Sequence, residues 1–195
     1  MENPDINVIR SKRKTISLFV DKNGCVIVKA PYFVSKKSID SFVEKNKQFI
    51  EKHRQRTLEE NERAERLGAY TKDDIKRMKD IARKAFPDAV GYYAGLIGVK
   101  FGKITVRRQT TRWGSCSPNG NISLNILLCD CPDFVLRSVA AHEVCHLKVK
   151  NHGKEFYNLL YGIFPEYDEA RNWLNRNGNL LQRRYDLYLK SLGGT

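Results

Sequence analysis

The sequence predicts an α+β fold in which an N-terminal β-hairpin and a long helix come first, and a second helix, a small antiparallel sheet and several C-terminal helices follow. Two observations predict the sheets. Asn23 and Gly24 separate two β-rich runs, and Asn119 and Gly120 separate two more; Asn-Gly between such runs is a strong hairpin signal. The third observation predicts the helices, because apolar residues recur at helical spacing in the long stretches between and after these turns.

The first part of the chain is predicted to hold three strands, a long helix and a linker. Either Ser35 or Ser38 can cap the helix, which has apolar residues on one face and Lys and Glu on the other. Residues 57–70, rich in Glu and Arg, are interpreted as the helix end and a linker that closes near Gly68. The expected strands are residues 6–10, 15–20 and 25–30, and the expected helix is residues 35–60.

The middle of the chain is predicted to hold a second helix and a second sheet. Thr71 can cap the helix, with Asp73 and Asp74 in its first turn. Pro87 can kink or interrupt this helix before it stops at Gly98. The sheet is expected to be antiparallel, with strands at residues 104–109, 111–117 and 121–125.

The rest of the chain is predicted to be helical. One helix begins at Pro132 and Asp133, and its apolar residues recur at helical spacing up to His142. Gly178 is expected to end a later helix. The helices expected near the C-terminus are residues 154–160, residues 165–177 and a packed tail at residues 180–189.

The composition describes a globular protein, with 41% apolar and 29% charged residues in a chain of 195. No apolar run approaches the roughly 20 residues that span a bilayer, and the first five residues show no signal-peptide pattern. Five cysteines without framework spacing favour a reducing compartment, so we expect a cytoplasmic protein with no membrane partner. The net charge of +13 is interpreted first as a solvated surface, with weak nucleic-acid binding through that basic surface as the alternative.

Three of the four histidines lie within the eleven residues from His142 to His152. His142 and His146 are four residues apart, so on a helix their rings share one face. Two ring nitrogens can then reach one metal ion, and His152 can supply a third ligand after a turn. Three imidazoles favour Zn²⁺ over cobalt, nickel, manganese or iron, and the fourth coordination position would remain open for water, as catalytic zinc requires.

Glu143 directly follows the first of these histidines and can act as general base towards a zinc-activated water. Attack of the resulting hydroxide on a polarised carbonyl, followed by proton transfer to the leaving amine, is peptide hydrolysis in outline. The pattern therefore predicts a zinc metallopeptidase with a peptide or protein as substrate. Candidate donors to the oxyanion are Arg112, Tyr157 and Tyr161.

The ligand spacing also occurs in metzincins, but two features argue against that clan. Metzincins have a glycine three residues after the second histidine, where this chain has Val149. They also need a downstream methionine, and the methionines here are Met1 and Met78. We therefore expect the turn before His152 to depend on Asn151, a residue that tolerates the left-handed region.

The predicted second sheet comes directly before the histidine helix, so it can form a wall of the active site. Residues 107–117 can bind an extended peptide as an additional strand, or they are simply part of a packed sheet; both interpretations stay open. The candidate substrate-binding residues are Arg112, Trp113, Ser115 and Tyr157.

Four segments together resemble the YgjP-like family of zinc metallopeptidases, which is related to the SprT-like and gluzincin-type proteases. The segments are Trp-Gly-Ser-Cys at residues 113–116, Asn-Ile-Ser-Leu-Asn at 121–125, His-Glu-Val-Cys-His at 142–146 and Asn-His-Gly-Lys-Glu-Phe at 151–156.

The resemblance covers nearly the whole chain and implies a single metallopeptidase domain over residues 1–195, with an N-terminal sub-region at 1–60 and a zincin-like catalytic core at 70–195. It implies zinc held by His142, His146 and His152, with Glu143 as the catalyst. Some SprT-like proteases act on DNA-bound proteins, so a DNA-associated protein-processing factor is one alternative. A non-catalytic adaptor stabilised by zinc is the other.

Overall fold

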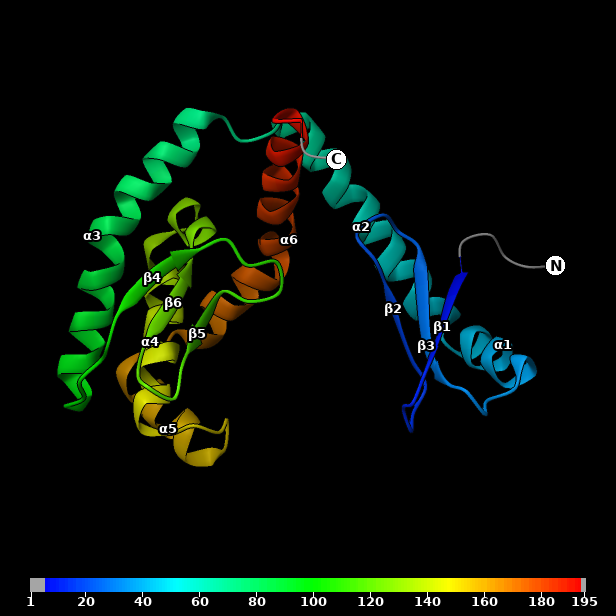
Figure 1. Ribbon diagram of the computed structural model, residues 1–195, viewed down its shortest axis with the longest axis horizontal. Coiled ribbons are helices and arrows are strands. Elements are labelled where there is room, and N and C mark those ends of the chain that lie inside the picture. The colour runs from blue at the N-terminus through cyan, green and yellow to red at the C-terminus, as the bar shows by residue number, and fades with distance from the viewer. Residues whose placement is uncertain (1–5, 194–195) are drawn as a thin grey trace. The chain divides into compact units, whose positions relative to one another are not determined.

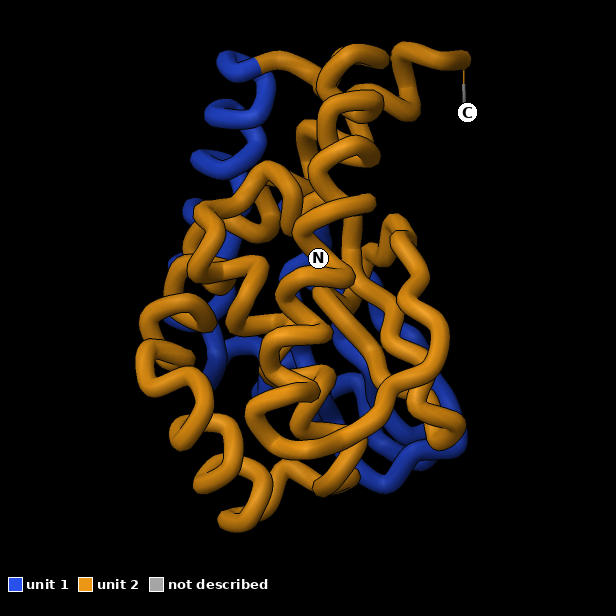
Figure 2. The backbone as a smooth tube through the Cα atoms, turned by 90° about the vertical axis from the view of Figure 1, so that its left-hand side faces the viewer, with its two compact units in different colours: residues 1–67 blue, residues 68–195 orange. Residues whose placement is uncertain are grey.

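The computed structural model describes residues 6–193; the first five residues, on which the expectation about a signal peptide rests, and the last two lie outside the described residues. The chain divides into two compact units, residues 1–67 and 68–195 (Figure 2). The first unit contains β1 (Ile6–Ser11), β2 (Ser17–Val20), β3 (Val26–Pro31), α1 (Lys36–Lys45) and α2 (Lys47–Leu67) (Figure 1).

The first unit is a three-stranded sheet whose buried face packs on α1 and α2. The predicted hairpin is confirmed: β2 and β3 pair antiparallel, and the turn between them contains Gly24 at a φ of 84°. β1 lies on the other side of β3 and pairs with it in parallel. The small core of this unit consists of Val26, Val28, Ala30, Ile39 and Ile50.

The single helix predicted for residues 35–60 is two helices that meet at Asn46. Ser35 caps α1 by accepting a hydrogen bond from the Ser38 amide. The Asn46 side chain donates to the Phe42 carbonyl at 2.7 Å, which ends α1 before α2 begins. α2 then continues to Leu67, so residues 57–70, predicted as a helix end and a linker, are helical up to that residue. Gly68, at a φ of 74°, follows the helix.

The second unit contains α3 (Lys72–Ile97), β4 (Ile104–Arg107), β5 (Gly114–Cys116), β6 (Ile122–Asn125), the 3₁₀ helix η1 (Ile126–Asp130), α4 (Asp133–Lys148), α5 (Lys154–Ile163) and α6 (Tyr167–Ser191) (Figure 1). α3 begins at Thr71 with a capping box in which Asp74 is the partner, and it ends at the left-handed Gly98. Pro87 lies inside α3 without interrupting it.

The second sheet has the order β4-β6-β5 and is mixed. β5 and β6 pair antiparallel through the predicted turn at Gly120, but β4 pairs with β6 in parallel, so the expectation of a wholly antiparallel sheet was wrong. The reason is the connection at residues 108–113, which takes the chain from one side of β6 to the other. The buried Asn125 holds this connection by donating to the carbonyls of Gln109 (2.7 Å) and Arg112 (2.9 Å).

α4, the helix that contains the paired histidines, is buried in the core of the second unit. It packs on α3, α5, α6 and strand β5, and most of its residues from Val135 to Cys145 are buried. This burial supports the helix along nearly its whole length, which fixes the positions of the side chains at its C-terminal end. Within residues 6–193, no helix is both long and apolar enough to cross a bilayer.

α6 is one continuous helix, not the two segments expected on either side of Gly178. Gly178 is buried at the middle of this helix. The Trp113 indole packs against it and occupies the space that a side chain at position 178 would need. A Cβ at Gly178 would lie 2.6 Å from Cζ2 of Trp113. Gly178 therefore allows the 108–113 connection to pack closely on α6, and it does not end the helix.

Candidate metal centre

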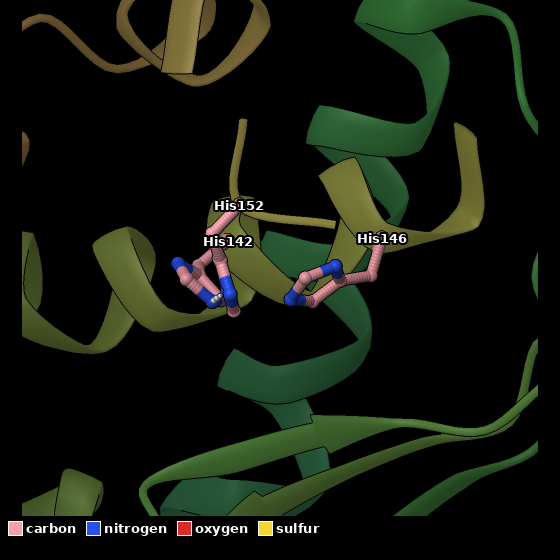
Figure 3. A group of neighbouring side chains, drawn as sticks. All are labelled: His142, His146 and His152. Carbon is pink, nitrogen blue, oxygen red and sulfur yellow. Dashed lines mark hydrogen bonds between the residues drawn. The ribbon is translucent and has the colours of Figure 1, made fainter. Parts of the chain in front are cut away.

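His142, His146 and His152 converge on one point of the second unit. One ring nitrogen from each is within 4.8 Å of the other two, and Nε2 of His142 and Nε2 of His152 are 3.0 Å apart. Figure 3 shows the three rings directed towards one another, two from α4 and one from the segment that follows it. The structure thus brings together the three histidines that the sequence singled out.

The turn that brings His152 back to α4 does not use a left-handed residue. Among residues 6–193, positive φ angles occur at glycines alone, so the role expected for Asn151 was wrong. α4 ends instead at Val149, which is extended, with φ −124° and ψ 112°. The Asn151 carbonyl accepts a hydrogen bond from the Gly153 amide at 2.8 Å, and α5 starts directly after this glycine.

Hydrogen bonds to the Nδ1 atoms orient the rings of His142 and His146. Nδ1 of His146 is 3.1 Å from the Val149 carbonyl, so this nitrogen donates and Nε2 remains available to a metal. Nδ1 of His142 is 3.1 Å from the Tyr167 hydroxyl, which leaves Nε2 of His142 directed at His152. Outer contacts of this kind are usual for metal-binding histidines.

Phe156 lies under all three imidazoles. Its ring centroid is 4.9, 4.6 and 4.8 Å from those of His142, His146 and His152, and its side chain is fully buried. The aromatic ring limits the rotation of each imidazole and keeps water from one side of the site. It stands on the first helical turn after Gly153, so its position depends on the same turn that brings His152 into place.

The donor set fits zinc. A tetrahedral zinc with bonds of about 2.0–2.1 Å needs ligand nitrogens about 3.4 Å apart, which is close to the separation of the His142 and His152 nitrogens; His146 would need a small adjustment. Burial, with a smaller effect from the other two histidines, lowers the pKa of His142 to about 4. The ring is therefore neutral at pH 7, as a metal ligand must be.

Glu143 lies beside the histidines and is 5% exposed. Burial raises its pKa to about 8, and the positive charge of Arg112 partly opposes this rise. Gly114 on β5 provides the space for the carboxyl group, because a Cβ at Gly114 would lie 2.6 Å from Oε1 of Glu143. In the metal-free protein the site therefore contains a buried, protonated glutamic acid against an edge strand.

Replacing Glu143 by glutamine is expected to stabilise the metal-free protein at pH 8. The unfolded chain ionises Glu143 above about pH 4.3, whereas the folded chain keeps the proton up to about pH 8. Between these values the folded state binds more protons, so its stability falls as the pH rises. Glutamine cannot ionise, and we expect a gain on the order of a few kcal/mol at pH 8 and little gain near pH 4.

Urea unfolding in the presence of a chelator, at both pH values, measures this difference. Glu169→Gln is the matched control, because Glu169 is exposed on α6. Equal pH dependence of wild type and Glu143→Gln would contradict the assignment of a buried neutral carboxyl.

A cavity of about 240 Å³ opens beside Glu143 and His142. Trp113, one of the predicted substrate-binding residues, forms part of its wall. Sequence reasoning also singled out His142 and Glu143, which line the cavity, but it missed the other lining residues. Four of these recur along one face of α6, a spacing that could have indicated them. These four are Tyr167, Arg171, Leu174 and Asn175, and the remaining lining residues are Gly114, Ser138 and Val139.

The other predicted substrate-binding residues lie near the site without lining this cavity. Arg112 is exposed and acts electrostatically on Glu143. Ser115 is on β5, opposite Ser123. The Tyr157 ring is 6.4 Å from that of His152, between centroids. Tyr161, the third oxyanion candidate, donates its hydroxyl to Asp168 at 3.0 Å.

Comparison with known proteins gives a family match and similarities to parts of several proteins. The model of the family described as YgjP-like, metallopeptidase domain, matches residues 14–76 and 69–177. A UTP pyrophosphatase of Escherichia coli (strain K12) is 27% identical over 105 residues, which are 52% of this chain and 56% of that protein. The match thus spans only about half the length of that relative.

Two solved structures are similar to part of the chain. They are the metallopeptidase zymogens jannalysin of Methanocaldococcus jannaschii and abylysin of Pyrococcus abyssi, both with a TM-score of 0.43. The first is 23% identical and covers 47% of this chain and 95% of its own; the second is 22% identical and covers 51% of this chain and 98% of its own.

Proposed function

The chain belongs to the YgjP-like metallopeptidase family, and we propose that it is a zinc-dependent peptidase whose reaction takes place in residues 68–195. The observation that carries the proposal is the convergence of His142, His146 and His152 beside the buried Glu143. Three imidazoles are the ligand set that suits zinc, and they leave one coordination position for water or substrate.

In the proposed site His142, His146 and His152 would hold the zinc, each through one ring nitrogen. When bound, the ion supplies a water of lowered pKa and a Lewis acid for the substrate carbonyl. Beside a bound cation, Glu143 would favour its ionised form. The carboxylate of Glu143 then accepts the proton of the attacking water and passes it to the leaving amine, so that one buried group acts first as base and then as acid.

The substrate is proposed to bind along β5. This strand is at the edge of its sheet, and Gly114 brings it against Glu143. An extended peptide paired with β5 would place its backbone across the site by strand addition, with Trp113 and Ser115 beside it. Arg112 and Tyr157 are the proposed donors to the oxyanion, since the Tyr161 hydroxyl already has a partner in Asp168.

A second candidate function is hydrolysis of a nucleoside triphosphate at the same site. The Escherichia coli relative is named for an activity on UTP. The specific observation that favours it here is the positive charge around the histidines. Arg112 and Lys150 act electrostatically on Glu143 and His146, and neither forms an ion pair with any residue in the range 6–193. Such a field attracts anionic substrates.

Digestion of a peptide library by the zinc-loaded protein tests the proposal, with UTP hydrolysis measured in parallel. We expect peptide cleavage by the wild type and its loss in Glu143→Ala, while zinc content stays near one equivalent in both. Glu169→Ala, which changes an exposed glutamate, should cleave as the wild type does. Hydrolysis of UTP without peptide cleavage would replace the first candidate by the second.

If the wild type cleaves neither substrate with DNA present or absent, and removal of zinc only lowers its thermal stability, the proposed catalytic function is wrong. The metal would then have a structural role, as in a zinc-stabilised adaptor.

A further inference from the structure

The cavity beside Glu143 has the size of a specificity pocket. Because His142 and Glu143 both line it, a group bound in it lies next to the reacting atoms. Its volume of about 240 Å³ is below the range of about 300–1,000 Å³ typical of sites that enclose a whole small molecule. The cavity is therefore suited to one side chain or one similar group of a substrate that extends beyond it.

The lining combines an apolar wall with a cationic group. Trp113, Val139 and Leu174 provide the apolar surface. Arg171 and Asn175 are one helical turn apart on α6 and are among the polar lining residues, and Arg171 is the lining residue with a guanidinium. Glu143 is the one acidic residue among the lining residues, and it is assigned to the proposed reaction.

Arg171 has no acidic partner of its own. No ion pair joins it to any residue that the structure describes, although Asp168 and Glu169 are close to it in sequence on the same helix. Its charge instead acts on Tyr167, the residue whose hydroxyl contacts His142. A solvated arginine is the alternative interpretation. Arg171 and Arg176 are both exposed residues of α6, but Arg171 lines the cavity and Arg176 does not.

The shape of the pocket depends on a close contact that places Trp113 on its wall. Trp113 packs directly on the backbone of Gly178, where any side chain would collide with the indole. The segment that contains Trp113 is held by Asn125 and by Gln182, whose side chain donates to the Gln109 carbonyl at 3.0 Å. Arg108 adds an ion pair to Asp186 on α6 at 2.6 Å. The aromatic wall and α6 are therefore fixed relative to each other.

We propose that this cavity is a specificity pocket for an anionic group of the substrate, with the guanidinium of Arg171 as its charge partner and the indole of Trp113 as its wall. A guanidinium binds carboxylate and phosphate groups through paired hydrogen bonds. In a peptide the bound group is the side chain of Asp or Glu next to the cleaved bond, and in a nucleotide it is a phosphate. The inference rests on the proposed function, because it names the substrate class of the same site.

Charge reversal at Arg171 tests the proposal. Three peptides that differ only in having Glu, Gln or Lys at the pocket position are compared by kcat/KM. We expect the wild type to prefer Glu, and Arg171→Glu to lower kcat/KM for the Glu peptide by about 10- to 100-fold while raising it for the Lys peptide. Arg176→Glu is the matched control and should change each value less than about twofold.

Binding is measured separately from cleavage. The chain has two tryptophans, so Trp173→Phe leaves Trp113 as the single fluorescent reporter in the pocket. In that background Glu143→Ala prevents turnover, and titration with the Glu peptide or with UTP should change the Trp113 emission. The change should weaken with added Arg171→Gln and persist with added Arg176→Gln.

The outcomes separate this inference from the proposed function. If peptides are cleaved but Arg171→Glu keeps the wild-type ratio of kcat/KM between the Glu and Gln peptides, the pocket assignment is wrong and the peptidase stands. If only UTP is hydrolysed and Arg171→Glu abolishes this, the pocket assignment stands with phosphate as its anionic group and the peptidase fails. If neither probe changes the Trp113 emission, the assignment is wrong whatever the activity.

Discussion

Replacing His152 by alanine is expected to lower the affinity of the protein for zinc by more than about 100-fold, because loss even of an outer partner of a metal ligand costs about 10- to 100-fold. His152 completes the proposed ligand set, and its Nε2 is 3.0 Å from that of His142. It also differs from His142 and His146 in the part of the fold that carries it. His142 and His146 are on the buried helix α4, whereas His152 is exposed on the segment between α4 and α5.

This difference makes His152→Ala a sharp test of the site. The side chain is exposed and lies outside the helices, so its removal should leave the fold intact and affect the metal alone. Zinc content after dialysis and competition with a chromogenic chelator measure the affinity. His53→Ala is the matched control, because His53 is the fourth histidine, belongs to the first unit and contacts Phe49, with ring centroids 4.0 Å apart. Equal zinc affinity in His152→Ala and wild type would exclude the three-histidine site.

The sequence singled out the three histidines that the structure brings together because their pattern is local. His142 and His146 share a helical face by spacing alone, and Glu143 comes between them in sequence. The caps at Ser35 and Thr71 were predictable for the same reason, since each involves a side chain and a backbone amide three residues away.

Features that depend on contacts between distant residues were missed or misread. Gly178 was taken as a helix end, since glycine is unfavourable inside a helix; its actual role depends on Trp113, which is distant in sequence. The direction of β4 depends on the connection that Asn125 holds, and no turn signal reveals such a crossover. The turn at Asn151 was misread because residue preference was applied to a segment whose conformation is set by α4 and α5 at its ends.

The pocket face of α6 is an intermediate case. Tyr167, Arg171, Leu174 and Asn175 have the spacing of one helical face, so the pattern was present in the sequence. A face with a tyrosine, an arginine, a leucine and an asparagine does not indicate which element it meets. Only the approach of α6 to α4 and to the 108–113 connection turns it into the wall of a cavity.

Replacing Gly114 by alanine is expected to lower kcat by about 100-fold while leaving zinc affinity nearly unchanged. An alanine Cβ would lie 2.6 Å from Oε1, 2.7 Å from Cγ and 2.9 Å from Cδ of Glu143, all within a distance that Cβ atoms do not adopt. Either β5 or the carboxyl group must therefore shift by roughly 1 Å, and a displacement of that size in a reacting group costs about 100-fold in rate. The ligand nitrogens lie outside this contact, so the metal should remain bound.

The comparison that isolates this effect is Gly162→Ala. Gly162 is on α5, where an added Cβ meets nothing within 4 Å, so the substitution adds a methyl group without a collision. Zinc content, kcat for the best peptide of the library and urea unfolding are measured for both variants. If Gly114→Ala retains full activity, the close contact between β5 and Glu143 is not needed for catalysis. The proposed binding of a substrate strand along β5 would then be wrong as well. If zinc is lost as well, the glycine supports the ligand helix as a whole rather than the general base, because Glu143 and the two helical histidines share α4.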